Sequence, residues 1–102
     1  MNMQQMMKQL KKMQEQMEKA QAALKAKTVE GRAGGGAVVV TMNGHKEILG
    51  VKIDPSVVDP DDVGLLEDLV QAAVAEALRA AEALAQEDLG RITGGLRIPG
   101  LF

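Results

Sequence analysis

The residues of this chain that could do chemistry are lysines, and they are concentrated at its amino end. Residues 1–27 contain six lysines and two glutamates, a net charge of +4, whereas residues 54–88 contain ten acids and one arginine, a net charge of −9. Salt screens exposed charges beyond about 8–10 Å, so a basic segment can act separately from an acidic body. Such a row of lysines is either a solvated face or a surface for phosphates, of which duplex DNA is the obvious source.

The remaining residues give little support for an enzyme. The chain has no cysteine, and its only histidine, His45, and only serine, Ser56, stand without a partner that could activate them. Four acids precede the second helix: Asp54, Asp59, Asp61 and Asp62. A calcium loop needs ligands at regular alternating positions, and two prolines interrupt these acids. Their spacing therefore favours a role in capping helices. We therefore expect a protein that is not an enzyme, with no metal, no cofactor and no small-molecule substrate.

Aromatic residues are nearly absent, since Phe102 is the only one. Proteins that hold single strands stack the bases on aromatic side chains. Any contact with nucleic acid is therefore expected to use phosphates and the shape of a duplex.

The lysines share their segment with a regular apolar pattern. Gaps of three and four residues separate its members, as along the seam of a coiled coil: Met3, Met6, Leu10, Met13, Met17, Ala20 and Leu24. The pattern predicts a helix over about 2–26, roughly 36 Å long at 1.5 Å per residue. A chain of this size cannot bury such a seam alone. We therefore expect a second helix to pack against it, either from the same chain or from a second copy.

Three short strands are predicted between about 28 and 53. The first covers 28–33 and is followed by three glycines, and the second and third cover 37–42 and 45–53. Asn43 and Gly44 between them predict a hairpin in which both residues adopt positive φ. Val38 and Val40 are expected to pack against a helix or a second subunit, because three strands with one apolar face need a cover.

A second long helix is predicted over about 60–89. Asp59 would cap it, Pro60 would occupy its first position and Gly90 would end it. Its apolar residues span most of its circumference, so it should contact both the sheet and the first helix. The prediction is thus a single α+β domain over 1–92, followed by a flexible tail over 93–102.

The sequence predicts a soluble protein of the cytoplasm. Its amino end is rich in Gln and Lys where a signal peptide would need an apolar core. Its most apolar stretch, 69–85, is interrupted by charged residues, so no membrane partner is expected.

The order and spacing of several segments resemble the YbaB/EbfC family of bacterial nucleoid-associated proteins. The similar segments are 6–9 with 13–15 in the first helix, 39–44 in the hairpin, 51–56 at the end of the sheet, 66–70 with 72–73 in the second helix, and 94–96 in the tail. Together they extend over nearly the whole chain.

The resemblance implies a homodimer with a tweezer-like outline, in which long helices project as arms from a β core built by both subunits. It also implies binding to double-stranded DNA that alters DNA conformation, with roles in nucleoid organisation and gene regulation. In this family DNA contact is ascribed to the arms, which here carry Lys8, Lys11, Lys12, Lys19 and Lys25, with Arg79 and Arg91 as candidates on the second helix.

A different interpretation remains open at the level of sequence. The methionine-rich helix could grip a partner helix or an apolar groove, and the protein would then be an interaction scaffold for which DNA binding is incidental.

Overall fold

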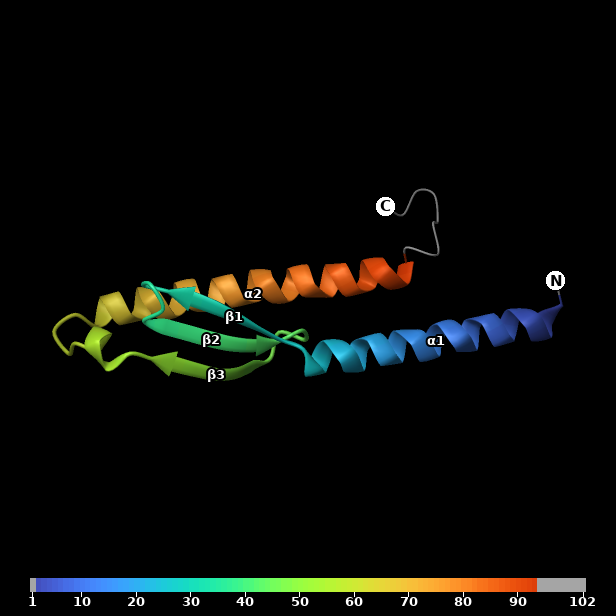
Figure 1. Cartoon of the computed structure of the whole chain (residues 1–102), viewed down its shortest axis with the longest axis horizontal. Helices are drawn as coiled ribbons and strands as arrows, with labels where there is room; N and C mark the ends of the chain where they lie inside the picture. The colour runs from blue at the N-terminus through green and yellow to red at the C-terminus, as the bar shows by residue number, and fades with distance from the viewer. Residues whose placement is uncertain (1, 94–102) are drawn as a thin grey trace.

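The computed structural model describes residues 2–93, with Leu89 and residues 91–93 described by their backbone alone. Two long helices flank a three-stranded sheet in an elongated molecule of 71 × 25 × 16 Å (Figure 1). The elements are α1 (Met3–Ala26), β1 (Thr28–Ala33), β2 (Val38–Asn43), β3 (Ile48–Ile53), the 3₁₀ turn η1 (Pro55–Val57) and α2 (Val63–Thr93). The predicted α+β class is confirmed. The predicted flexible tail lies outside the described residues except for Thr93, which ends α2.

The first helix begins where the sequence predicts. Asn2 precedes it in extended conformation, and its side-chain oxygen accepts a hydrogen bond of 2.8 Å from the Gln5 N–H. This bond satisfies one of the amide groups that have no partner at a helix start.

The sheet is an antiparallel meander in the order β1-β2-β3. Three glycines with positive φ, residues 34–36, turn the chain from β1 into β2. On β2 the alternate residues Val38, Val40 and Met42 are fully buried, whereas all six residues of β3 are exposed. The apolar core is therefore centred on β2.

The second turn differs from the one predicted. Neither Asn43 nor Gly44 has positive φ, and Lys46, at 65°, takes the left-handed conformation instead. The loop thus has three residues, closed by bonds from the Lys46 N–H to the Asn43 carbonyl and from the Asn43 N–H to the Glu47 carbonyl, each 3.0 Å. The buried side chain of Asn43 explains the difference: its oxygen accepts from the His45 and Glu47 N–H groups, which holds Asn43 in the strand.

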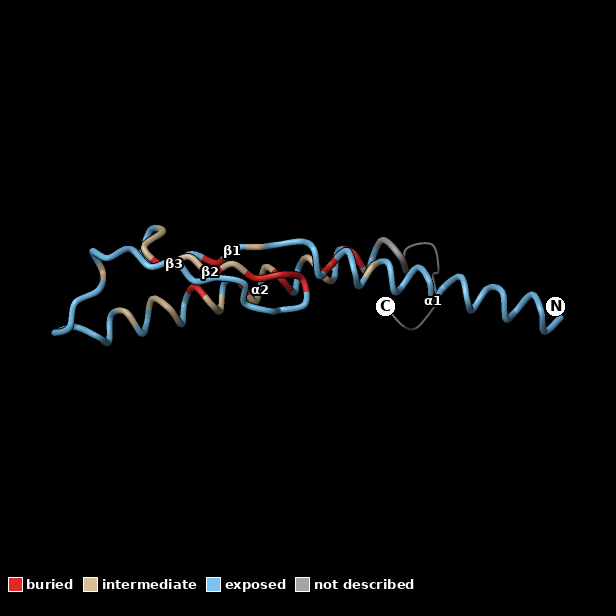
Figure 2. Tube along the Cα trace, turned by 90° about the horizontal axis from the view of Figure 1, so that it is seen from below, coloured by how far each residue is buried: buried red, intermediate tan, exposed pale blue. Residues whose placement is uncertain are grey.

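Helix α2 packs on β1 and β2 through small residues. Ala73, Ala77 and Ala81 follow one another at intervals of four on a single face and are fully buried against the sheet. Figure 2 shows the buried positions gathered where β2 meets α2. Gly31 of β1 lies so close to α2 that an added Cβ would overlap the Ala73 carbonyl and the Ala77 backbone.

The predicted ends of the second helix are wrong at both sides. Asp59 accepts bonds from the backbone N–H groups of Asp61 and Asp62 in a turn, and α2 begins only at Val63, where the Asp62 carboxylate accepts from Leu65 N–H at 3.4 Å. At the other end α2 continues through Gly90 to Thr93, because a helix tolerates one glycine at a cost of about 1 kcal/mol.

Of the four acids predicted to cap helices, Asp54 and Asp62 do so. At η1 the Ser56 N–H donates to Asp54 at 2.9 Å and lowers the pKa of that carboxyl below its usual value. A hydrogen bond to the charged form of a carboxyl favours that form.

We expect Gly31→Val to destabilise the protein by about 2–3 kcal/mol or more, because the new side chain forces β1 and α2 apart. Gly64→Ala, in α2 with nothing near its Cβ position, is the matched control and should be neutral or stabilising by up to about 1 kcal/mol. Urea unfolding followed by circular dichroism, at equal protomer concentration, measures both. Equal stability of the two variants would contradict the close contact.

Candidate nucleic-acid interface

Helix α1 projects from the sheet as an arm. Its described residues are exposed except for Ala20, which is partly buried, and Leu24, which is 3% exposed (Figure 2). Because α1 begins 24 residues before it reaches the sheet, most of its length extends beyond the sheet (Figure 1). The arm, by which we mean α1, is therefore a separate surface attached to the body at one end.

The predicted apolar seam is uncovered along the arm. Exposure falls from 80% at Met3 to 39% at Met17, with Met6, Leu10 and Met13 between these values. Of the predicted packing positions, only Leu24 and the two strand residues, Val38 and Val40, are buried, and the strand residues lie beneath α2 of the same chain. In the described part of the chain, no helix covers the seam over residues 3–17.

The lysines of the arm divide into two rows. At about 100° per residue, Lys8, Lys12 and Lys19 point within about 40° of one another, and this row lies about 150° from the seam. Lys11 and Lys25 form a second row, about 100° from the first. All five are exposed, so a cover on the seam would leave the first row free.

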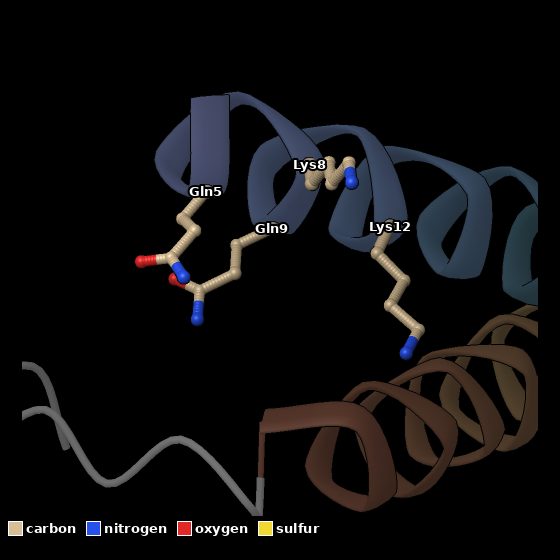
Figure 3. Close-up of a pocket in the computed structure, with 4 residues that line it drawn as sticks. All are labelled: Gln5, Lys8, Gln9 and Lys12. Carbon is tan, nitrogen blue, oxygen red and sulfur yellow. The ribbon is translucent and has the colours of Figure 1, made fainter. Parts of the chain in front are cut away.

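The first lysine row borders shallow hollows rather than a closed pocket. Gln5, Lys8, Gln9 and Lys12 line one of about 450 Å³, in which Gln5, Gln9 and Lys12 extend from the same side of the helix (Figure 3). Two others, of about 370 and 230 Å³, include Lys11 and again Lys12. A hollow open along one helix cannot enclose a small molecule, but its ammonium and amide groups can follow an extended polyanion.

No ion pair among the described residues neutralises the charge of these lysines. In the described part, the ion pairs are Lys27–Asp88, Arg32–Glu30 and Lys46–Glu82, and none involves Lys8, Lys11, Lys12, Lys19 or Lys25. Glu15 and Glu18 are the only acids on the arm. The arm therefore presents unpaired positive charge to solvent, while the acids of the chain are concentrated on α2 and the turn before it.

The two arginines predicted on the second helix are placed differently. Arg79 is exposed on the part of α2 that covers the sheet, away from the projecting lysines, with Glu76 and Glu82 three residues to either side. The side chain of Arg91 lies outside the described residues. The structure thus brings the arm lysines together and leaves Arg79 apart from them.

A second surface, on β3, was not predicted from the sequence. Ile48, Val51 and Ile53 pair with Met42, Val40 and Val38 of β2 and so lie on the same face of the sheet as the core. Helix α2 does not extend over them, and they remain 52%, 49% and 36% exposed. The alternation of Leu49, Val51 and Ile53 was the available signal, but it does not show which strands a helix covers.

Comparison with known proteins agrees with this architecture. The model of the YbaB/EbfC DNA-binding family matches residues 1–96. The chain belongs to this family. It is 55% identical to a nucleoid-associated protein of Alkaliphilus metalliredigens, over 99% of this chain and 89% of that protein. It is 50% identical to a nucleoid-associated protein of Pelotomaculum thermopropionicum, over 99% and 96% of the two chains.

A solved structure shares the fold. The crystal structure of an uncharacterized protein of Helicobacter pylori superposes with a TM-score of 0.81, covering 92% of this chain and 99% of that one at 22% identity. The resemblance found in the sequence is therefore confirmed at the level of family and fold.

Two further properties concern the described residues. None of their helices is both long and apolar enough to span a bilayer. No group of three or more His, Cys, Asp or Glu side chains among them is arranged to hold a metal ion.

Proposed function

We propose that this protein is a homodimer that binds double-stranded DNA through its lysine arms and alters DNA conformation. The observation that carries this proposal is the row of Lys8, Lys12 and Lys19, exposed, without ion pairs, and on a projecting helix. Membership in a DNA-binding family supports the choice of polyanion. Lys11 and Lys25 are proposed to add to the field of the arm, and Arg79 and Arg91 to contribute less.

The dimensions and chemistry of the arm suit a duplex. Its 24 residues extend about 36 Å, close to one turn of B-DNA at about 34–36 Å. The arm has no arginine for the bidentate contact that most often reads a base edge, and no aromatic side chain on which unpaired bases could stack. Binding is therefore proposed to depend on phosphates and to show little sequence preference.

The proposed dimer would cover exposed apolar surface. Ile48, Val51 and Ile53 continue the core face of the sheet without a cover, and exposing such a patch on a strand at the edge of a sheet invites pairing with another chain. A second copy placed there would join the two sheets and direct two arms at one ligand. Each arm carries five lysines and two glutamates, a net charge of +3, so the pair would present a charge of +6.

Two arms on one body would alter the duplex by mechanical constraint. Their separation is set by the protein, so the duplex must adjust to meet both sets of lysines. Bending a site of 20–30 base pairs by 40–90° costs on the order of 1–6 kcal/mol, which several phosphate contacts can offset. We place this activity in the nucleoid, in agreement with the names of the relatives, with organisation of the nucleoid and regulation of genes as its outcome.

The exposed methionines favour one alternative, an interaction scaffold, which an experiment can distinguish from a DNA-binding protein. Met3, Met7 and Leu10 are among the most exposed apolar side chains of the chain, as an apolar groove on a partner would require. A scaffold of this kind would keep its partner when the lysine row is neutralised, whereas a DNA-binding arm would lose its ligand.

Replacing Lys8, Lys12 and Lys19 together by Gln should weaken DNA binding equally for different sequences. The slope of log K against log salt is negative, and if all six lysines of a dimer contact phosphates its magnitude should fall by up to about 5, at about 0.9 per phosphate. Fluorescence anisotropy with a 30-base-pair duplex at several salt concentrations measures this slope.

The matched control replaces three cations of the body by Gln, namely Arg32, Lys46 and Lys52, and should retain the slope. Wild-type binding that does not depend on salt, or that is absent at about 50 mM salt, would contradict the proposal.

Val51→Glu should convert the dimer to a monomer of 10.8 kDa, because it places a charge where we propose the two sheets meet. Val58→Glu, at an equally exposed position off the sheet, is the control and should leave the dimer intact. Light scattering gives the mass, and circular dichroism verifies that each variant is folded. Dissociation by Met13→Glu instead would move the interface to the seam, and a monomeric wild-type protein would refute the dimer.

A further inference from the structure

The root of the arm, by which we mean residues 20–27 where α1 meets the sheet and α2, is held by an ion pair between residues distant in the sequence. Lys27, which follows the last residue of α1, places its Nζ 2.8 Å from Oδ2 of Asp88 on α2, 61 positions later. Asp88 is 8% exposed, whereas the side chain of Lys27 is 43% exposed. A carboxylate this deeply buried needs a charged partner, and Lys27 is the one it has among the ion pairs of the described residues.

A second contact to the root of the arm comes from the turn between β2 and β3. The Gly44 N–H donates to the carbonyls of Leu24 and Lys27, at 2.9 and 3.1 Å, and so caps the end of α1. The approach is close, since a Cβ on Gly44 would lie 2.5 Å from the Leu24 carbonyl oxygen. Because Asn43 braces this turn with its own side chain, the cap is attached to a rigid part of the sheet.

Beyond the root, little else in the chain holds the arm. Leu24 is its only buried residue, and the residues before Ala20 are all exposed. The direction of the arm is therefore decided by contacts at residues 20–27. Of these, the Gly44 cap acts through backbone atoms and fixes one point, while Lys27–Asp88 adds a second point on α2.

Small rotations at the root become large displacements at the lysines. Lys8 lies 19 residues before Lys27, about 28 Å along the helix. A tilt of about 10° would move Lys8 by about 5 Å, more than the rise of about 3.4 Å from one base pair to the next. A root that holds the arm to a few degrees is what keeps two arms matched to the phosphates of one duplex.

We infer that the Lys27–Asp88 ion pair is the positioning contact that sets the direction of the arm relative to α2. The inference about direction stands on contacts within one chain, and only its consequence for DNA rests on the proposed function. Lys46–Glu82, 3.5 Å long with both side chains about half exposed, does not hold the root, because an exposed pair of this kind contributes little.

The experiment measures the direction of the arm directly. The chain has no cysteine, so Gln16→Cys on the arm and Gln71→Cys on α2, both at exposed positions, take a pair of spin labels. Labelled protein re-equilibrated with an excess of unlabelled protein gives the distance distribution within one protomer by pulsed electron resonance. The variants compared are Lys27→Met, Lys27→Arg, and Lys27→Asp combined with Asp88→Lys.

Lys27→Met should broaden or shift the distribution, and Lys27→Arg and the exchanged pair should restore it. Arg32→Gln, which removes the exposed pair with Glu30, is the matched control and should leave the distribution unchanged. In DNA titrations Lys27→Met should lower affinity while keeping the salt slope, because the lysines of the arm are intact but less well positioned.

An unchanged distribution in Lys27→Met would overturn the inference. So would loss of the circular-dichroism signal in both Lys27→Met and the exchanged pair, since the ion pair would then support the whole fold rather than the arm. Failure of DNA binding in a protein whose distances behave as expected would refute the proposed function and leave the positioning contact in place.

Discussion

The close contact between α2 and β1 determines how the rest of the chain is arranged. Alanines at 73, 77 and 81 and a glycine at 31 let the helix lie directly on the backbone of the sheet. A helix held so near to β1 and β2 does not reach β3, and its buried stripe is too short to cover α1 along its length. The same contact that closes the core therefore leaves one strand face and one helix open, and these are the two surfaces available for partners.

Separation of charge follows from this arrangement. The acids of the chain lie mainly on α2 and the turn before it, whereas the arm carries lysines and extends past the end of α2 (Figure 1). Had α1 packed along α2, its lysines would have met these carboxylates and formed ion pairs. The structure makes one such pair, Lys27–Asp88, at the root, and the lysines farther out keep their charge.

What the sequence predicted well was local. The 3-4 spacing from Met3 to Leu24 predicted a helix that ends within a residue of the observed one, and the strands followed from their composition. The errors fell in turns and at helix ends: Asn43 stays in β2 because its buried side-chain oxygen accepts from the His45 and Glu47 N–H groups, which the Asn-Gly pattern does not show. The Lys27–Asp88 pair leaves no periodic signal, and the alternation in β3 does not show that its apolar face stays open, because each depends on which elements meet in space.

The angular arrangement of α1 explains how one helix can serve two roles. Its seam and its row of Lys8, Lys12 and Lys19 lie about 150° apart around the axis. A cover on the seam and electrostatic contact with phosphates can therefore occur at once, on opposite sides. Were the rows adjacent, burying the seam would desolvate the ammonium groups, at a cost that the phosphates would have to offset. Heptad spacing avoids this conflict, since it keeps the charged positions off the seam for the whole length of the arm.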